Sequence, residues 1–318
     1  MSEREHTVDL RVFAEPQEGA CYQDQLVMAQ CAEDAGYGAF FRSDHFMKTG
    51  PVDGRPGPSD AWITLGALAR ETKRIRLGTL MTAATFRYPG PLAVAVAQVD
   101  EMSGGRIEFG FGAGWFEGEH KANGVPFPSV RERFQRCEEQ LEIITGLWRT
   151  PEGETYSYAG RHYEVTDSPA LPKPAQRPHP PIIIGGKGPK RTPALAARFA
   201  DEFNVSLKDM ELSGGQFERV AEACRAIGRD PKEITLSVAQ TVCVGRDDTE
   251  VAKRAAVLNR SPEDLRANAL AGTPAEVVDR IGQWAERTGV QRIYLQVLDL
   301  SDFDHVELIA AEVVPQLG

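Results

Sequence analysis

Short apolar segments alternate with longer amphipathic segments along most of the chain. Eight apolar segments are predicted to be strands, because each is short, rich in branched or aromatic residues and bounded by turn residues. A segment with helical spacing follows each strand, for example 131–148, 216–227 and 274–288, where Thr273 precedes Pro274 as an N-cap. The predicted strands begin at Val8, Gly38, Ile75, Arg106, Pro181, Glu202, Ile234 and Arg292.

Regular alternation of strands and helices predicts an α/β protein with a parallel sheet. Eight such units favour closure into a (β/α)8 barrel, or TIM barrel, over an open sheet. All 318 residues are expected to form one domain, because barrels of this size commonly do. The active site of such a barrel lies at the carboxyl ends of its strands, so the residues that follow the strands are the candidates for chemistry.

The alternation is interrupted between the fourth and fifth predicted strands. Residues 155–165 alternate weakly around Ala159-Gly160, which predicts a hairpin, and residues 168–181 contain six prolines. Proline neither pairs within a central strand nor continues a helix. We therefore predict insertions after strand 4 and before strand 5. We expect residues 155–180 to form the substrate pocket together with the loop after the fourth strand.

Composition and charge restrict the classes of partner. The net charge of -10 offers no general basic surface for nucleic acid, and no apolar run reaches the ~18 residues of a membrane span. The five cysteines include no C-x-x-C pair, which argues against a zinc site or a disulfide framework. Residues 1–7 are polar and lack the apolar core of a signal peptide, so a cytoplasmic protein with a small-molecule substrate is expected.

A glycine-rich turn follows the fifth predicted strand. Residues 185–188, Gly-Gly-Lys-Gly, separate a buried strand from a helix, so the backbone can approach a phosphate closely and the helix amino terminus supplies free N–H groups. Lys187, Lys190 and Arg191 add positive charge to this turn. An ordinary turn with solvated lysines is the alternative. We favour an anion site, because these barrels often bind phosphate on a loop in their second half.

Asp44 and His45 follow the second predicted strand. An imidazole at this position is able to donate a hydrogen bond to a substrate or to move a proton near neutral pH. A histidine that only hydrogen-bonds its own loop is the alternative interpretation. The location at a strand end favours the functional one.

Glycines and an aromatic residue follow the fourth predicted strand. Gly112 and Gly114 leave room for a flat cofactor close to the backbone, with Trp115 as a wall, although Trp115 is equally suited to plain packing. The segment is not a dinucleotide fingerprint, because Trp115 stands where the third glycine is required. The acidic and histidine residues of 117–120 lack the spacing of a zinc site, so no metal site is predicted.

Taken in order, these motifs resemble the luciferase-like monooxygenase superfamily over nearly the whole chain. The resemblance is strongest to members that depend on coenzyme F420. The motifs that carry it are Ser43-Asp44-His45-Phe46, 76–81 (Arg-Leu-Gly-Thr-Leu-Met), 85–89, 98–106, 112–117 (Gly-Ala-Gly-Trp-Phe-Glu), 172–174, 180–186 (Pro-Pro-Ile-Ile-Ile-Gly-Gly) and 200–204 (Ala-Asp-Glu-Phe-Asn).

The resemblance implies a flavin-like cofactor at the mouth of the barrel. Members usually hold a cis peptide bond after the third strand, here Leu80-Met81, behind the cofactor ring. His45 would polarise or protonate near the ring, with Asp44 orienting it, so these two are the implied catalytic residues. The implied cofactor-binding residues are Asp44, His45, Thr79, Leu80, Met81, Gly112, Gly114, Trp115, Glu117, Ile184, Gly185, Gly186, Lys187 and Asn204.

The predicted reaction is hydride transfer between coenzyme F420 and a small organic substrate. The alternatives are an FMN-dependent monooxygenase that uses dioxygen, and a non-catalytic flavin-binding barrel or an unrelated sugar-phosphate enzyme. Trp115 stands where relatives that oxidise glucose 6-phosphate carry a glutamate, which argues against that substrate. Because the family often forms dimers, a homodimer is expected.

Overall fold

The computed structural model describes residues 8–206 and 209–317. The barrel strands are β1 (Asp9–Ala14), β2 (Ala39–Arg42), β3 (Arg76–Thr79), β5 (Ile107–Gly112), β8 (Ile182–Gly185), β9 (Glu202–Val205), β10 (Thr235–Val244) and β12 (Arg292–Val297).

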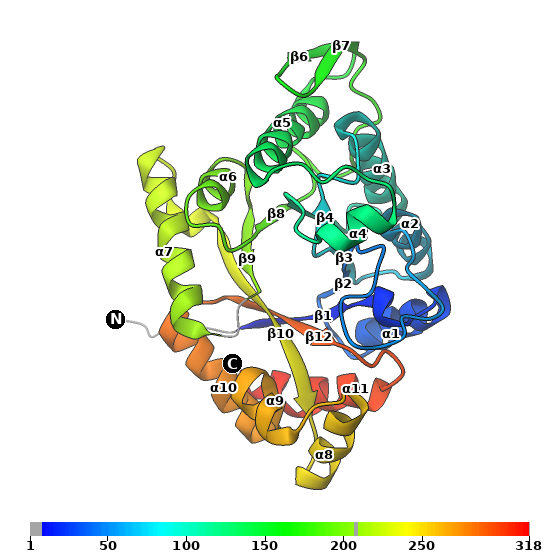
Figure 1. The fold of residues 1–318 in the computed structure, drawn as a ribbon, viewed down its shortest axis with the longest axis vertical. Coiled ribbons are helices and arrows are strands. Elements are labelled where there is room, and N and C mark those ends of the chain that lie inside the picture. The colour runs from blue at the N-terminus through cyan, green and yellow to red at the C-terminus, as the bar shows by residue number, and fades with distance from the viewer. Residues whose placement is uncertain (1–7, 207–208, 318) are drawn as a thin grey trace.

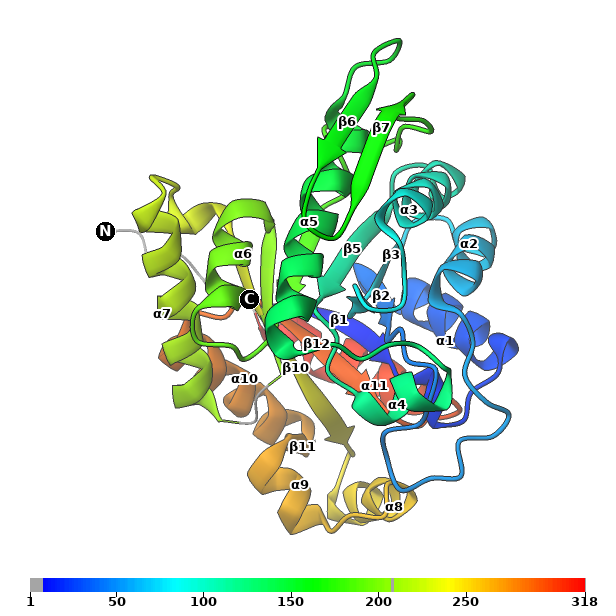
Figure 2. The same ribbon diagram turned by 45° about the horizontal axis from the view of Figure 1, so that its top comes forward.

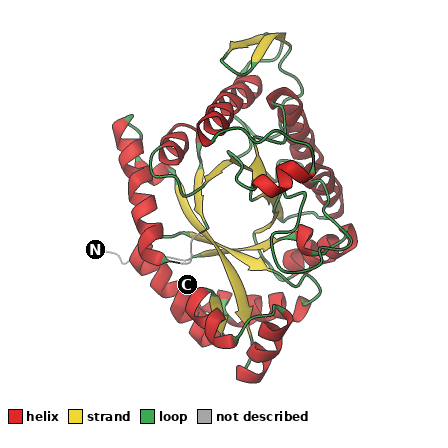
Figure 3. Ribbon diagram, viewed as in Figure 1, coloured by secondary structure: helices red, strands yellow, loops and turns green. Residues whose placement is uncertain are grey.

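Within the described residues these eight strands are parallel and close into a barrel (Figure 1, Figure 3). The order around the barrel is the order along the chain, and β12 pairs with both β10 and β1. They are the eight strands predicted from the sequence, and the (β/α)8 barrel is therefore confirmed.

Helices surround the barrel, as the apolar spacing predicted (Figure 1). None of the described helices is both long and apolar enough to cross a membrane. The predicted helices are α1 (Tyr22–Asp34), α2 (Ala61–Glu71), α3 (Pro89–Ser103), α5 (Val130–Arg149), α6 (Arg191–Phe199), α7 (Met210–Ala226), α8 (Asp248–Val257), α10 (Pro274–Thr288) and α11 (Phe303–Glu312). Shorter elements that the sequence did not predict are η1 (Pro16–Glu18), β4 (Thr82–Ala83), α4 (Glu117–Ala122), η2 (Pro231–Glu233), α9 (Pro262–Asn268), β11 (Leu270–Gly272) and η3 (Val314–Gln316).

Two helix starts show how capping decides a boundary. α10 begins where predicted, because Thr273 and Glu276 form a capping box at its amino terminus. α7 begins six residues before the predicted start at 216, at Met210. There the Asp209 side chain accepts a hydrogen bond from the N–H of Leu212 and caps the helix. This cap starts the helix ahead of two glycines, which the sequence pattern had placed outside it.

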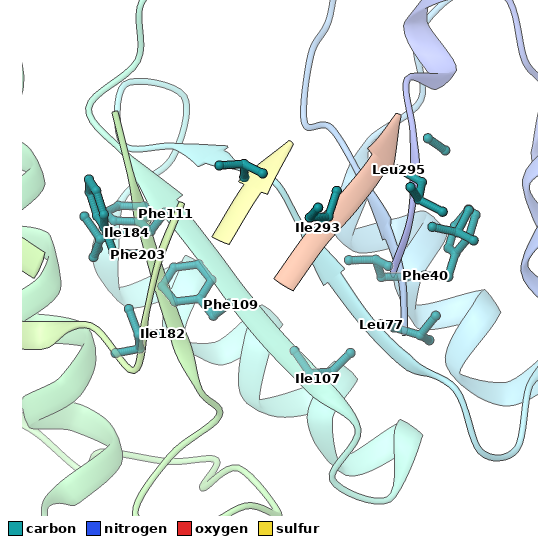
Figure 4. Close-up of a cluster of buried hydrophobic side chains, with 14 of the residues drawn as sticks. Phe40, Leu77, Ile107, Phe109, Phe111, Ile182, Ile184, Phe203, Ile293 and Leu295 are labelled. Carbon is teal, nitrogen blue, oxygen red and sulfur yellow. The ribbon is translucent and has the colours of Figure 1, made fainter. Parts of the chain in front are cut away.

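Alternate residues of each barrel strand face opposite ways. One set packs outward against the helices, and part of it is shown in Figure 4, including Ile107, Phe109 and Phe111 of β5. The other set faces the barrel interior, where Phe41 and Tyr294 pack edge to face with ring centroids 4.9 Å apart. The outer layer thus holds the helices in place, while the inner layer fills the middle of the barrel.

Ion pairs with buried carboxylates lie in the amino-terminal part of the barrel interior. Arg11 lies 2.7 Å from Glu108, and Arg292 lies 2.6 Å from Glu202. Burial alone would lower the pKa of Arg11, but the charge of Glu108 outweighs it and raises that pKa. Because a buried charge is costly when it has no partner, the pairing keeps Glu108 and Glu202 from being left as unpaired charges inside the barrel.

An antiparallel hairpin projects from the barrel beyond α5 (Figure 2). Its strands are β6 (Tyr156–Ala159) and β7 (Glu164–Ser168), which confirms the predicted hairpin insertion. The Glu139 carboxylate on α5 accepts hydrogen bonds from three backbone N–H groups of residues 161–163. These bonds hold the turn of the hairpin against α5.

Gly110 in β5 provides a test of the packing inside the barrel. A Cβ atom there would overlap the backbone carbonyl of Thr79, which cannot move like a side chain. We predict that Gly110→Ala lowers the free energy of unfolding by at least about 1–3 kcal/mol in chemical denaturation. As the matched control, Gly282→Ala adds the same methyl group to open space in α10 and should stabilise by about 0.5–1 kcal/mol. Equal effects of the two substitutions would contradict this packing.

Candidate active site

A cavity of about 600 Å³ lies at the carboxyl ends of the barrel strands. This is the end at which barrels of this kind carry their active sites. The structure brings together on its wall the following predicted residues: Asp44, His45, Leu80, Met81, Gly112, Gly114, Trp115, Gly185, Gly186, Lys187 and Asn204.

Three other predicted residues are not part of the cavity wall. Thr79 is buried and donates a hydrogen bond from Oγ1 to the carbonyl oxygen of Gly110. Ile184 is buried in the layer between the barrel and the helices. Glu117 is exposed on α4 and pairs with Lys121 at 2.8 Å. Neighbouring residues on the same segments face the cavity instead, so a cofactor contact of Thr79, Ile184 or Glu117 has no support from the cavity wall and stays a prediction.

Met81 lies on the cavity wall where β3, β5 and β8 end. The Leu80-Met81 peptide bond is cis, as the family resemblance implied. A Cβ atom on Gly185 would overlap the Met81 side chain, and one on Gly112 would lie 3.6 Å from the Met81 sulfur. The absence of side chains at the two glycines therefore leaves an open apolar surface at this point, which is suited to a flat ring.

His45 is held by a carboxylate that the sequence analysis did not assign to it. Its Nδ1 lies 3.1 Å from Oε2 of Glu119, which is only 1% exposed and also accepts the backbone N–H of Phe46. Burial alone would lower the pKa of His45, but the hydrogen bond to Glu119 and the charges of Glu119 and Glu15 raise it above its ordinary value. Because Glu119 engages Nδ1, the ring presents Nε2 for contact with a ligand.

Asp44 does not orient His45, contrary to the prediction. Its carboxylate lies 3.0 Å from the Arg87 guanidinium, which also contacts Asp60 at 2.9 Å. Burial alone would lower the pKa of Arg87, but the two carboxylates outweigh it and raise that pKa. Asp60 in turn caps the amino terminus of α2. Asp44 thus fixes the loop after β2 to neighbouring elements, and Glu119 takes the orienting role.

Aromatic side chains enclose the His45 side of the cavity. The Trp115 and Phe116 rings stack with centroids 5.2 Å apart, and His45 meets Trp115 edge-on at 5.7 Å. Trp115 is 65% exposed, so it is not a core residue. The structure therefore favours a role of Trp115 in the cavity wall over the alternative that it only packs in the core.

The 185–188 turn has the features of an anion site. Gly186 has a φ of +140°, and a Cβ on Gly188 would lie 2.9 Å from Thr192 Oγ1, so side chains are disfavoured at both positions. α6 starts at Arg191, shortly after the turn, and the side chain of its N-cap residue, Lys190, accepts no hydrogen bond from the first N–H groups. Lys187 lines the cavity as well. Free N–H groups, a helix dipole and a lysine together suit a phosphate group.

The hairpin does not contribute to the cavity, although the sequence analysis expected it to. No residue of 155–180 is among the described residues that line it. The loop after β5, which was predicted to form the pocket together with the hairpin, does line the cavity. Residues of α4 and Arg133 and Phe134 of α5 line it as well. Sequence reasoning missed these α5 residues, because their helical spacing indicates only an amphipathic helix.

Comparison with known proteins identifies the family. Residues 7–261 match the family described as luciferase-like monooxygenase, and the chain belongs to this family. An F420-dependent glucose-6-phosphate dehydrogenase from Microbacterium testaceum is 39% identical over 183 residues, which are 57% of this chain and 52% of the relative. An FMNH2-dependent dimethylsulfone monooxygenase from Pseudomonas putida is 30% identical over 215 residues, 63% of this chain and 56% of the relative. The chain thus spans about half the length of these curated relatives.

Solved structures share the fold over nearly the whole chain. An F420-dependent secondary alcohol dehydrogenase in complex with an F420-acetone adduct has a TM-score of 0.83 at 19% identity, covering 98% of this chain and 99% of that chain. A monooxygenase from Streptomyces bottropensis has a TM-score of 0.79 at 24% identity, covering 96% and 100%. At such identities the likeness shows the fold alone.

The contact between His45 and Glu119 gives a prediction for the pKa of His45. Glu119→Gln removes the charge that raises this pKa, so NMR titration of the His45 ring should give a lower value than in the wild type. The control Glu117→Gln removes an exposed carboxylate two residues away and should leave the pKa of His45 unchanged. An unchanged value in Glu119→Gln would contradict the contact.

The same contact sets the direction of a pH effect on stability. Because folding raises the pKa of His45, its protonation stabilises the fold, fully below the unfolded-state pKa of about 6.5. This contribution disappears as pH rises through the folded-state pKa.

Proposed function

We propose that this protein is an oxidoreductase that transfers hydride between coenzyme F420 and a small organic substrate. The observation that carries the proposal is one cavity that joins a phosphate-type turn at 185–188, an apolar floor at Met81 and His45. When bound, the deazaflavin supplies the carbon that accepts or donates the hydride. The turn and Lys187 would hold its phosphate, and Leu80, Met81 and Gly112 would contact its ring.

His45 would act on the substrate oxygen. With Nδ1 directed at Glu119, the protonated ring is able to donate from Nε2 to a carbonyl. In the reverse direction the neutral ring, which keeps its proton on Nδ1, is able to accept a proton from a hydroxyl at Nε2. Burial alone would lower the pKa of His45, but Glu119 raises it above its ordinary value, so the ring keeps its second proton to higher pH than a free histidine does. Asp44 is a positioning residue in this scheme, since its carboxylate is engaged by Arg87.

The wall of the cavity favours an apolar substrate over a sugar phosphate. Trp115 and Phe116 present stacked aromatic faces beside His45. Trp115 also replaces the glutamate that the family resemblance associates with oxidation of glucose 6-phosphate. We therefore propose a substrate different from that named for the Microbacterium relative.

The second candidate is an FMN-dependent monooxygenase that uses dioxygen. The similarity to the FMNH2-dependent enzyme from Pseudomonas putida favours it, but at 30% identity against 39% for the F420-dependent relative. The same turn would bind the phosphate of FMN, so the two candidate functions must be distinguished by measuring the binding of F420 and of FMN.

The homodimer stays a prediction.

A fluorescence titration of the protein with F420 and with FMN tests the proposal. We predict that F420 binds more tightly and that F420-linked turnover does not need dioxygen. Tight FMN binding with NADH turnover in air, and none with F420, would instead support the monooxygenase. Binding of neither compound would support an unrelated barrel.

Matched glycine variants make the titration specific to the site. Gly185→Val places a side chain against Met81 and should weaken cofactor binding. The control Gly90→Val lies in α3, where a Cβ meets nothing within 4 Å, and should bind as the wild type does. Equal affinities of the two variants for the cofactor would show that the 185–188 turn is not part of the cofactor site.

A further inference from the structure

The rim of the 185–188 turn carries more positive charge than one phosphate requires. Lys187, Lys190, Arg191 and Arg131 make no ion pair within the described residues, whereas the nearby Arg198 is paired with Glu138 and Glu142. The chain has a net charge of -10, so four unpaired cations at one place stand out. In the proposed function, Lys187 and the amino terminus of α6 would suffice for a single phosphate.

Two of these cations line a second cavity, of about 370 Å³, between α5 and α6. Arg131 comes from the start of α5 and Arg191 from the start of α6, which lie beside each other (Figure 2). The Arg191 guanidinium lies 5.8 Å from the centre of the Phe134 ring and donates a hydrogen bond to the backbone carbonyl of Arg131. Phe134 lines both this cavity and the cofactor cavity. The second cavity therefore adjoins the first at Phe134, on the side of the 185–188 turn where α6 begins.

We call this second cavity the groove between α5 and α6. A ligand whose phosphate lies on the 185–188 turn must continue beyond that phosphate to place an anionic group in the groove. Guanidinium groups bind carboxylates well, because the planar fork matches two oxygens. FMN ends at its phosphate, whereas coenzyme F420 continues beyond its phosphate into a chain of glutamate residues. The two cofactors therefore differ in the part that would meet Arg131 and Arg191.

We propose that the groove between α5 and α6 binds carboxylates of the glutamate tail of coenzyme F420, through Arg131 and Arg191. This inference rests on the proposed function and adds a tail-binding site to it. Each contact is exposed, so each contributes modestly and is weakened by salt. Two such contacts together should change affinity by about tenfold at low salt.

The test compares F420 carrying its glutamate tail with the form that ends before the first glutamate. Affinities for the purified protein are measured by fluorescence titration at low and high salt. We expect the tailed form to bind wild type about tenfold more tightly at low salt, and this advantage to shrink as salt is added. The double variant Arg131→Gln/Arg191→Gln should lose the advantage of the tailed form, and any weakening of the tail-free form should be smaller than that loss.

A charge-matched control separates local contacts from net charge. Lys73→Gln/Lys253→Gln also removes two exposed cations, but neither residue lines either cavity. This control should keep the full advantage of the tailed form.

The outcomes separate the groove from the proposed function. Equal affinity of the wild type for the tailed and tail-free forms overturns the proposal that the groove binds the tail, but it leaves the proposed dependence on F420 unaffected. An advantage that survives in Arg131→Gln/Arg191→Gln also overturns the groove. If neither form binds, the proposed function fails and the tail site fails with it.

Discussion

The convergence of three strand ends around Met81 is the constraint on which the cavity depends. β3, β5 and β8 bring their carboxyl ends to one place, and glycines at 112 and 185 keep side chains out of it. Protein interiors are packed densely, so an open cavity persists only where side chains are kept away. The glycines thus set the shape of the site before any polar residue contributes to its chemistry.

The polar residues of the site are fixed by two separate charge contacts. Asp44 is engaged by Arg87, which also reaches Asp60 at the start of α2. Glu119 is engaged by His45 and by the backbone of Phe46. Each buried carboxylate therefore has its own partners, so the loop after β2 is tied to α2 through one and to α4 through the other. This arrangement places His45 on the wall of the cavity that Met81 also lines, without leaving the carboxylates of Asp44 and Glu119 unpaired.

Much of the fold could be predicted from the sequence, because eight short apolar segments alternate with helical segments and this pattern is typical of a (β/α)8 barrel. The glycine turn and Asp44-His45 were found because they follow buried strands, and the structure places both on the cavity wall. Glu119 was missed as the partner of His45, because α4 has six residues and no apolar period to predict it. Glu117, two residues earlier on the same short helix, was chosen instead and points to solvent.

The hairpin shows a different limit. Its strands were predicted from local alternation, but its direction depends on Glu139 of α5, a contact across more than twenty residues. The expectation that it covers the pocket was therefore wrong. Long-range contacts of this kind, and the tilt of α5 that brings Phe134 to the cavity, have no local signature in the sequence.

A crystal structure of the protein with coenzyme F420 tests the central claim most directly. We predict the phosphate on the backbone N–H groups of residues 185–188, with the ring against Met81 and within reach of His45. A phosphate bound at any other strand end, or a ring that does not contact Met81, would contradict the assignment of this cavity.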